Sequence, residues 1–146
     1  MSGGKGTTFD GQLLALIFNA TAISSPSLAQ NESSTPLTNL YVALHTTSPA
    51  AGGTQTTNEA AYTSYARVAV ARTSGGWTVT GASVSPAATI SFPTATGGSE
   101  TETYFSVGSA SSGAGEILYW GPLSSNIVVS NGVTPQLTTS TVITEA

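Results

Sequence analysis

The chain has 146 residues and no cysteine, which is enough for one domain with a packed core and excludes a disulfide framework and thiolate chemistry. Its net charge is −4 with only three basic residues, so it lacks the cationic footprint that nucleic acid or an anionic membrane surface requires. No stretch approaches the roughly 20 apolar residues of a membrane span. Charged residues make up 7% of the chain, so the polar surface is mainly Ser, Thr, Asn and Gly. Such a surface favours broad neutral contact with other proteins, because that contact buries no charge.

The first 38 residues predict an N-terminal arm with one short helix, expected over about 8–20 and capped by Thr7 or Thr8. Apolar residues there recur at spacings of three and four, which is typical of one helix face. These residues are Phe9, Leu13, Leu16 and Ile17. So apolar a helix must dock on its own domain, on a twin subunit or on a larger partner. Residues 21–38 are rich in Ser, Thr and Pro and predict an extended linker.

Residues 39–146 predict a β-sandwich domain. Short runs with alternating apolar residues are separated by Gly-rich turns such as "TGGS", "SSGAG" and "SNG", and no further helical periodicity occurs. About eight strands are expected, over residues 40–46, 65–73, 77–81, 88–93, 103–110, 116–123, 126–130 and 134–144. Without crossover helices their pairing must be antiparallel. The predicted fold class is therefore all-β, an antiparallel two-sheet sandwich of jelly-roll or related Greek-key type.

The strand expected over 116–123 is apolar on both faces. Leu118 and Trp120 share one face, and Ile117 and Tyr119 share the other. Because such a strand is covered on both sides, we expect Leu118, Tyr119 and Trp120 in the core or at a subunit interface. The second cover is then the N-terminal helix or a neighbouring subunit. A sugar-binding platform is the alternative, built from Tyr104, Phe105, Tyr119, Trp120 and Trp77.

Residue types for catalysis or metal binding are scarce. A nucleophilic triad needs a base, and the only histidine, His45, is expected to close the first strand and to hydrogen-bond loop backbone. Glu100 and Glu102 share a strand face, but they follow a Gly-Gly turn and are expected to be solvated edge residues. One Asp and one His do not make a metal site. The sequence thus predicts no enzymatic activity, no metal and no cofactor.

The stretch around His45 also holds Arg67, one of two arginines in the chain. We expect Arg67 to pair with an acid or to donate to a loop carbonyl. This concentration of ionisable groups is then part of the frame of the domain rather than an active site.

Four motifs together resemble a family of small structural proteins of tailed bacteriophages. They are "LYVALHTTSPAAGG", "NEAAYTSYARVAV", "ISFPTAT" and "YFSVGSASSGAGEILYWGPL", and the similarity runs from about Phe9 to the C-terminus. Members are often labelled tail or tail-fibre proteins, and similar small β-sandwich proteins serve as capsid cement or decoration proteins, usually trimeric or dimeric. The resemblance implies a virion structural protein and carries over no catalytic residues.

On this basis we expect a capsid cement protein on the virion surface, which binds the outer shell and stabilises contacts between capsomers. Its partners would be the major capsid protein and further copies of itself. The expected capsid-docking face is the helix face formed by Phe9, Leu13, Leu16 and Ile17. The alternatives are a tail, baseplate or tail-fibre accessory protein of the virion, and a secreted carbohydrate-binding module.

Overall fold

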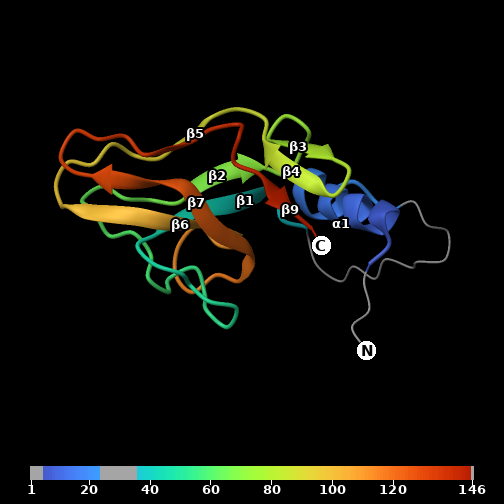
Figure 1. The fold of residues 1–146 in the computed structure, drawn as a ribbon, viewed down its shortest axis with the longest axis horizontal. Helices are drawn as coiled ribbons and strands as arrows, with labels where there is room; N and C mark the ends of the chain where they lie inside the picture. Colours follow the sequence, from blue (N-terminus) through green and yellow to red (C-terminus); the bar gives the residue numbers. More distant parts are fainter. Residues whose placement is uncertain (1–4, 24–35, 146) are drawn as a thin grey trace.

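A computed structural model describes residues 5–23 and 36–145 of the chain. These residues form helix α1 and nine strands, arranged as Figure 1 shows. The elements are α1 (Thr7–Asn19), β1 (Asn39–His45), β2 (Val68–Ala71), β3 (Trp77–Thr80), β4 (Ser83–Pro86), β5 (Ile90–Ser91), β6 (Glu100–Gly108), β7 (Ile117–Val129), β8 (Gln136–Leu137) and β9 (Ile143–Thr144). Most of the predicted linker, residues 24–35, and residues 1–4 of the arm lie outside the described residues.

The strands pair in antiparallel fashion in two layers. One layer is a four-stranded sheet in the order β2-β1-β6-β7. The other contains the sheet β3-β4-β9 and the pair β5-β8. Helix α1 lies at one end of the molecule against β3 and β4 (Figure 1). The predicted fold class, an antiparallel all-β sandwich preceded by one short helix, is confirmed.

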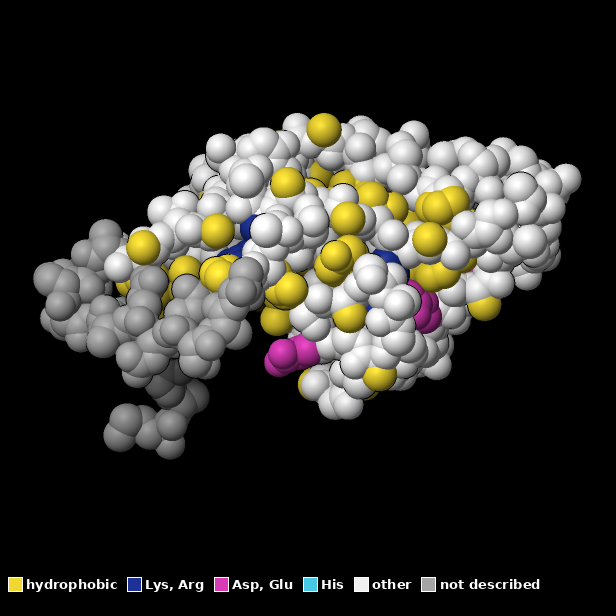
Figure 2. All heavy atoms as spheres, turned by 180° about the vertical axis from the view of Figure 1, so that it is seen from behind, with side chains coloured by type: hydrophobic (Ala, Val, Ile, Leu, Met, Phe, Trp, Pro, Cys, Tyr) yellow, Lys and Arg dark blue, Asp and Glu magenta, His cyan; other side chains and the backbone are white. Residues whose placement is uncertain are grey.

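Few charges reach the surface. Figure 2 shows a face on which Lys, Arg, Asp and Glu form small isolated groups, while hydrophobic atoms are scattered among neutral polar ones. The exposed large apolar side chains of the described residues are Leu37, Trp120, Val128 and Val142. The neutral surface that the composition predicts is therefore present.

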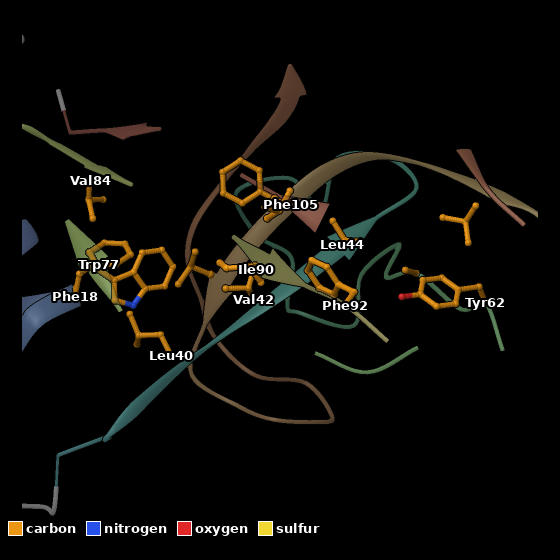
Figure 3. Close-up of a cluster of buried hydrophobic side chains, with 14 of the residues drawn as sticks. Phe18, Leu40, Val42, Leu44, Tyr62, Trp77, Val84, Ile90, Phe92 and Phe105 are labelled. Atoms are coloured by element: carbon orange, nitrogen blue, oxygen red, sulfur yellow. The ribbon is translucent and has the colours of Figure 1, made fainter. Parts of the chain in front are cut away.

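The hydrophobic core lies between the two layers (Figure 3). Side chains alternate along β1, so that Leu40, Val42 and Leu44 are buried on the face that meets the second layer. Burial of one such side chain stabilises the fold by roughly 1.5–3 kcal/mol. The opposing side chains come from β3, β4, β5, the segment after β5, and β8; they are Trp77, Val84, Ile90, Phe92 and Leu137.

Helix α1 extends this core instead of standing apart from it. Leu14 and Phe18 are fully buried, and the ring of Phe18 meets Trp77 edge-on, with ring centroids 4.8 Å apart. A Cβ atom at Gly11 would lie 2.7 Å from the carbonyl oxygen of Gly81, so the helix approaches the β3–β4 turn more closely than a larger residue allows. The buried face is thus set by positions 14 and 18, and is rotated from the face that the sequence predicted. The expected Thr cap is absent, since Gly6 is the N-cap residue and makes no side-chain cap bond.

Arg72, one residue after β2, fastens the C-terminal end of the helix. Its Nε donates to the carbonyl of Ile17 at 2.7 Å, and one terminal nitrogen donates to that of Leu16 at 2.8 Å. The other terminal nitrogen donates to the carbonyl of Leu37 at 2.8 Å. Carbonyls in the last turn of a helix have no partner within the helix, and the negative end of the helix dipole favours a cation. One side chain therefore joins the helix, the end of the arm and the four-stranded sheet.

Several strand boundaries differ from the prediction. The strands expected over 116–123 and 126–130 are one strand, β7, and the strand expected over 134–144 is reduced to the short strands β8 and β9. Strand β4 was missed because Val84 is its only large apolar side chain. In β2 the pairing begins at Val68 rather than near Tyr65, because residues 65–67 are held by loop contacts described below.

Strand β7 is the edge of its sheet and is interrupted near its middle. The register pairs Glu102 with Ile127 but Tyr104 with Pro122, so residues 123–126 of β7 stand opposite a single residue of β6. This is a special bulge with four residues opposite one, and it lies directly beside a proline, which has no N–H to offer. The exposed edge is therefore not a continuous row of regular donors and acceptors.

The position of α1 predicts a contrast between two neighbouring leucines. Leu14→Ala should lower the free energy of unfolding by about 2–5 kcal/mol, because it opens a cavity between the helix and the sandwich. Leu13→Ala, at a half-buried position, should cost less than about 1.5 kcal/mol. Urea denaturation of both variants measures the difference. Equal losses would show that the helix packs with a different face.

Candidate functional site

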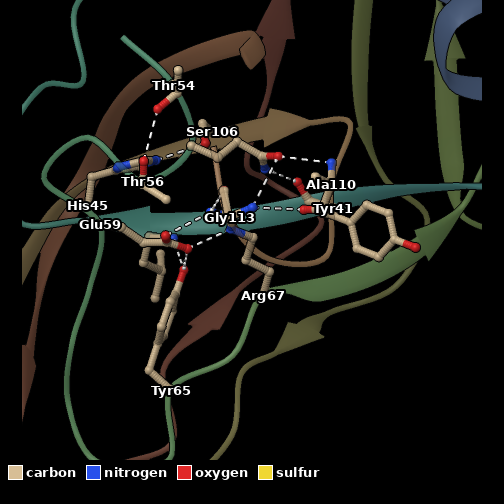
Figure 4. A network of polar contacts seen from close by, with 12 residues as sticks. Tyr41, His45, Thr54, Thr56, Glu59, Tyr65, Arg67, Ser106, Ala110 and Gly113 are labelled. Atoms are coloured by element: carbon tan, nitrogen blue, oxygen red, sulfur yellow. Dashed lines mark hydrogen bonds and ion pairs between the residues drawn. The ribbon is translucent and has the colours of Figure 1, made fainter. Parts of the chain in front are cut away.

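The long loop after β1 folds back over the outer face of the four-stranded sheet and buries polar groups there (Figure 4). His45 is fully buried at the end of β1. Its Nδ1 donates to the carbonyl of Thr57 at 2.9 Å, and its Nε2 lies 2.8 Å from the hydroxyl of Ser106. Because a carbonyl can only accept, Nδ1 carries the proton and Nε2 accepts from Ser106. Burial lowers the pKa of His45, so the imidazole is neutral. The predicted bond from His45 to loop backbone is confirmed.

Ser106 and His45 are as close as a catalytic nucleophile and its base, but they lack the open site that a substrate needs. Both residues are fully buried, with no exposed surface that a substrate could reach. The third position, where a carboxylate would orient the base, is taken by a backbone carbonyl. The pair joins β1, β6 and the loop, and the arrangement gives a substrate no access.

Arg67 is the centre of the same network. Its guanidinium binds both oxygens of Glu59, with Nε–Oε1 at 2.6 Å and a terminal nitrogen to Oε2 at 2.8 Å. The terminal nitrogens also donate to the carbonyls of Ala110 and Gly113, at 2.9 and 2.7 Å. The Arg67 side chain is only 2% exposed. Arg67 therefore pairs with an acid and also donates to loop carbonyls, which confirms both predicted roles.

Gln55 links this network to the backbone of the sheet. The side chain is fully buried; its Nε2 donates to the carbonyl of Tyr41 at 3.0 Å, and its Oε1 accepts from the backbone N–H of Ala110 at 3.0 Å. Gly108 makes room for it, since a Cβ there would lie 2.3 Å from the Gln55 side chain. Tyr65 completes the cluster by donating to Glu59 at 3.1 Å and accepting from the N–H of Leu44 at 3.1 Å.

The carboxyl pair on β6 is not at a solvated edge, so that prediction was wrong for Glu102. Glu102 is fully buried, and neither of its carboxyl oxygens has a hydrogen-bond partner among the described residues. Burial, reinforced by the neighbouring Glu100 carboxylate, raises its pKa to about 8. Glu100 accepts from the backbone N–H groups of Ala61 and Tyr62 at 2.8 and 2.7 Å, and so holds the loop that covers Glu102.

The aromatic residues of interest lie in three different environments. Trp77 is buried in the core. Tyr119 packs on Phe18 of the helix at 5.5 Å between ring centroids, and its hydroxyl donates to Glu145 at 2.6 Å. Leu118 and Tyr119 both pack against the core, whereas Trp120 is 40% exposed and lies 6.0 Å from the ring of Tyr104. The predicted sugar platform is thus divided, since Trp77 and Phe105 are buried and Tyr119 packs on the helix, while Tyr104 and Trp120 lie next to each other.

The predicted docking face of α1 is divided. Ile17 packs against the hydrophobic core of the domain. Phe9, Leu13 and Leu16 are only partly buried and do not belong to that core cluster. These three residues leave an apolar stripe on the helix for contact with another surface, and their docking role remains a prediction.

The described residues hold neither a cluster of metal ligands nor a membrane-spanning helix. In residues 5–23 and 36–145, no three His, Asp or Glu side chains come together as ligands for a metal ion. The single helix of the same residues lacks the length and apolar character needed to cross a membrane.

Taken together, the fold and the network define a rigid β-sandwich whose buried polar groups hold its own loops in place. The sequence model of one family, described as podophage GP4 fiber I protein gp80, matches residues 7–145. The match spans nearly the whole chain, so the chain belongs to this family and is a bacteriophage structural protein. No curated protein matches it. The resemblance to phage structural proteins is confirmed at this level, without distinguishing the capsid surface from the tail.

Glu102 predicts how stability changes with pH. Its pKa of about 8 in the folded state exceeds its ordinary value of 4.5, so between these values the folded protein holds a proton that the unfolded chain has lost. The free energy of unfolding should therefore fall as pH rises through this window, by at most about 5 kcal/mol, and level off above it.

Glu102→Gln should abolish this decline, because the amide carries no titrating proton. Urea denaturation at about pH 5, 7 and 9 measures the effect. The matched control is Glu116→Gln, at an exposed glutamate, which should keep the decline of the unchanged protein. A decline that persists in Glu102→Gln would assign it to another group.

Proposed function

We propose that the chain is a non-catalytic structural component of a phage fibre or of the place where a fibre joins the tail. The observation that carries this proposal is the match of residues 7–145 to a family named for a fibre protein. It favours the tail-fibre alternative over the capsid cement role that we expected from the sequence. The secreted binding module loses support, because Trp77 and Phe105 are buried and Tyr119 packs on the helix, which leaves Trp120 beside Tyr104 from its aromatic platform.

The polar network supports a structural role. The chain has one histidine, and both of its ring nitrogens are engaged in a closed contact with Thr57 and Ser106. Arg67 and Arg72, two of its three basic residues, donate to backbone carbonyls, and Arg67 also binds one carboxylate. Groups that an enzyme would present to a substrate are here used to fix loops and the helix.

The neutral surface supports a role in protein assembly. A contact between Ser- and Thr-rich surfaces removes few charges from water, so it avoids the desolvation penalty that buried ions carry. Modest contacts of this kind gain strength when symmetry repeats them in an assembly. The proposed partners are other virion proteins at the tail and further copies of this chain.

The position on the particle is tested by counting copies. Quantitative mass spectrometry of purified virions should give a copy number close to that of the tail or fibre proteins, and gold-labelled antibodies should mark the tail. A copy number comparable with that of the major capsid protein, with label over the shell, would establish the cement role instead. Absence of the chain from virions would refute both virion assignments.

The stripe on helix α1 is the proposed attachment surface. Leu13→Asp with Leu16→Asp should leave the sandwich folded and reduce incorporation into particles by more than about tenfold, because two charges would have to be buried in the contact. Thr78→Asp with Thr80→Asp, two exposed positions of β3, adds the same charges elsewhere and should be incorporated normally. Mass spectrometry of particles that carry each variant gives the comparison, with circular dichroism as the test of folding. Equal incorporation of the two variants would exclude the helix stripe as the attachment surface.

A further inference from the structure

A groove lies at the open edge of the sandwich. It lies between β7 and the C-terminal residues 136–142, two segments that belong to opposite layers (Figure 1). Its volume is about 490 Å³, within the range of small-molecule binding sites in proteins. We call it the edge groove. It is formed on one side by the bulge of β7, so the irregularity that interrupts the edge strand also shapes the cavity.

The edge groove is lined by neutral polar groups over an apolar floor. Side chains of the bulge line one wall, namely Ser124, Ser125 and Asn126, and Gln136, Thr138 and Ser140 line the other. The buried side chains of Phe105 and Leu137 form its floor, and further apolar residues line it, namely Pro122, Leu123, Ile127 and Val142. No charged residue lines the groove, and none occurs in the sequence between Glu116 and Glu145. A ligand that fits this lining is uncharged, carries many hydroxyl or amide groups, and has an apolar face.

The two walls differ in how far their polar groups are already engaged. Ser124, Ser125 and Asn126 make no side-chain hydrogen bond to other described residues, and all three are exposed. On the opposite wall Gln136 donates to Ser91 at 3.0 Å, and the hydroxyls of Thr138 and Ser140 lie 2.6 Å apart. One wall is thus held in position by its own contacts, and the other offers hydroxyl and amide groups to a ligand.

An extended peptide that adds to the edge of the sheet fits less well. Strand addition needs a regular row of backbone donors and acceptors on the edge strand. Strand β7 lacks such a row at the groove, because Pro122 has no N–H and residues 123–126 leave the ladder. Recognition in the groove must therefore rely on side chains.

We propose that the edge groove is a binding site for a neutral saccharide. Hydroxyl groups of a sugar ring match the hydroxyl and amide groups of the walls, and the C–H face of the ring matches the apolar floor. This site differs from the aromatic platform considered from the sequence, since Phe105 is the one residue of that platform that lines the groove. The proposal does not depend on the fibre role, because the purified chain is tested away from the particle.

The test is an array of neutral glycans probed with the labelled full-length chain, followed by titration of the best glycan by calorimetry. Ser124→Ala with Ser125→Ala should weaken that binding by about tenfold, the loss expected for two hydrogen bonds between neutral groups. The matched control, Ser111→Ala with Ser112→Ala in another exposed loop, should change it by less than about twofold.

Three outcomes would overturn the proposal. The first is that no glycan on the array binds. The second is that the bulge variant binds the best glycan with unchanged affinity. The third is that this glycan shifts the nuclear magnetic resonance signals of residues around Tyr104 and Trp120 instead of those that line the groove. If uncharged peptides on a parallel array bind while glycans do not, the groove serves a peptide and the saccharide assignment is wrong. None of these results affects the copy number in virions, so the proposed function is tested independently.

Discussion

The fold depends on the guanidinium group of Arg67, whose N–H groups donate hydrogen bonds to backbone carbonyls of a loop. The sandwich has long connections, and carbonyls buried beneath them have no strand partner, so each needs another donor. Arg67 supplies two of these donors, to Ala110 and Gly113, while Glu59 compensates its charge. Arg72 performs the same task for the end of α1 and for Leu37. Charge is rare in this chain, and most of its positive charge stabilises internal contacts.

Apolar periodicity in the sequence predicted the strands and the helix that depend on short-range patterns. The short apolar runs predicted the approximate positions of β1 and β6, and the apolar run after Thr8 predicted a helix. The face of that helix could not be predicted, because apolar side chains cover more than one side of it. The close approach of Gly11 to Gly81, a contact between segments 70 residues apart in the sequence, decides which face is buried. Strand β4 was missed because pairing with β3, not hydrophobicity, keeps it extended.

The sequence predicted the roles of some residues of the candidate site but not the burial of others. His45 and Arg67 met the expectation that they hold the domain together, since both bind loop backbone and side chains of the same domain. The burial of Glu102 could not be read from its position after a glycine turn. Glu102 and Ser106 lie on the outer face of the sheet, and only the folding of residues 46–66 over that face removes them from water. The edge groove likewise arises between segments whose proximity no local pattern reveals.

The sparse surface charge has a consequence for the kinetics of assembly. Long-range electrostatic attraction speeds the encounter of many protein pairs, and without it association proceeds at roughly 10⁵–10⁶ M⁻¹s⁻¹. A chain with this surface must meet its partners by unaided diffusion, so its incorporation depends on its concentration around the growing particle. Once in place, its neutral contacts are not screened by ions. The bound state should therefore persist equally in dilute water and in concentrated salt.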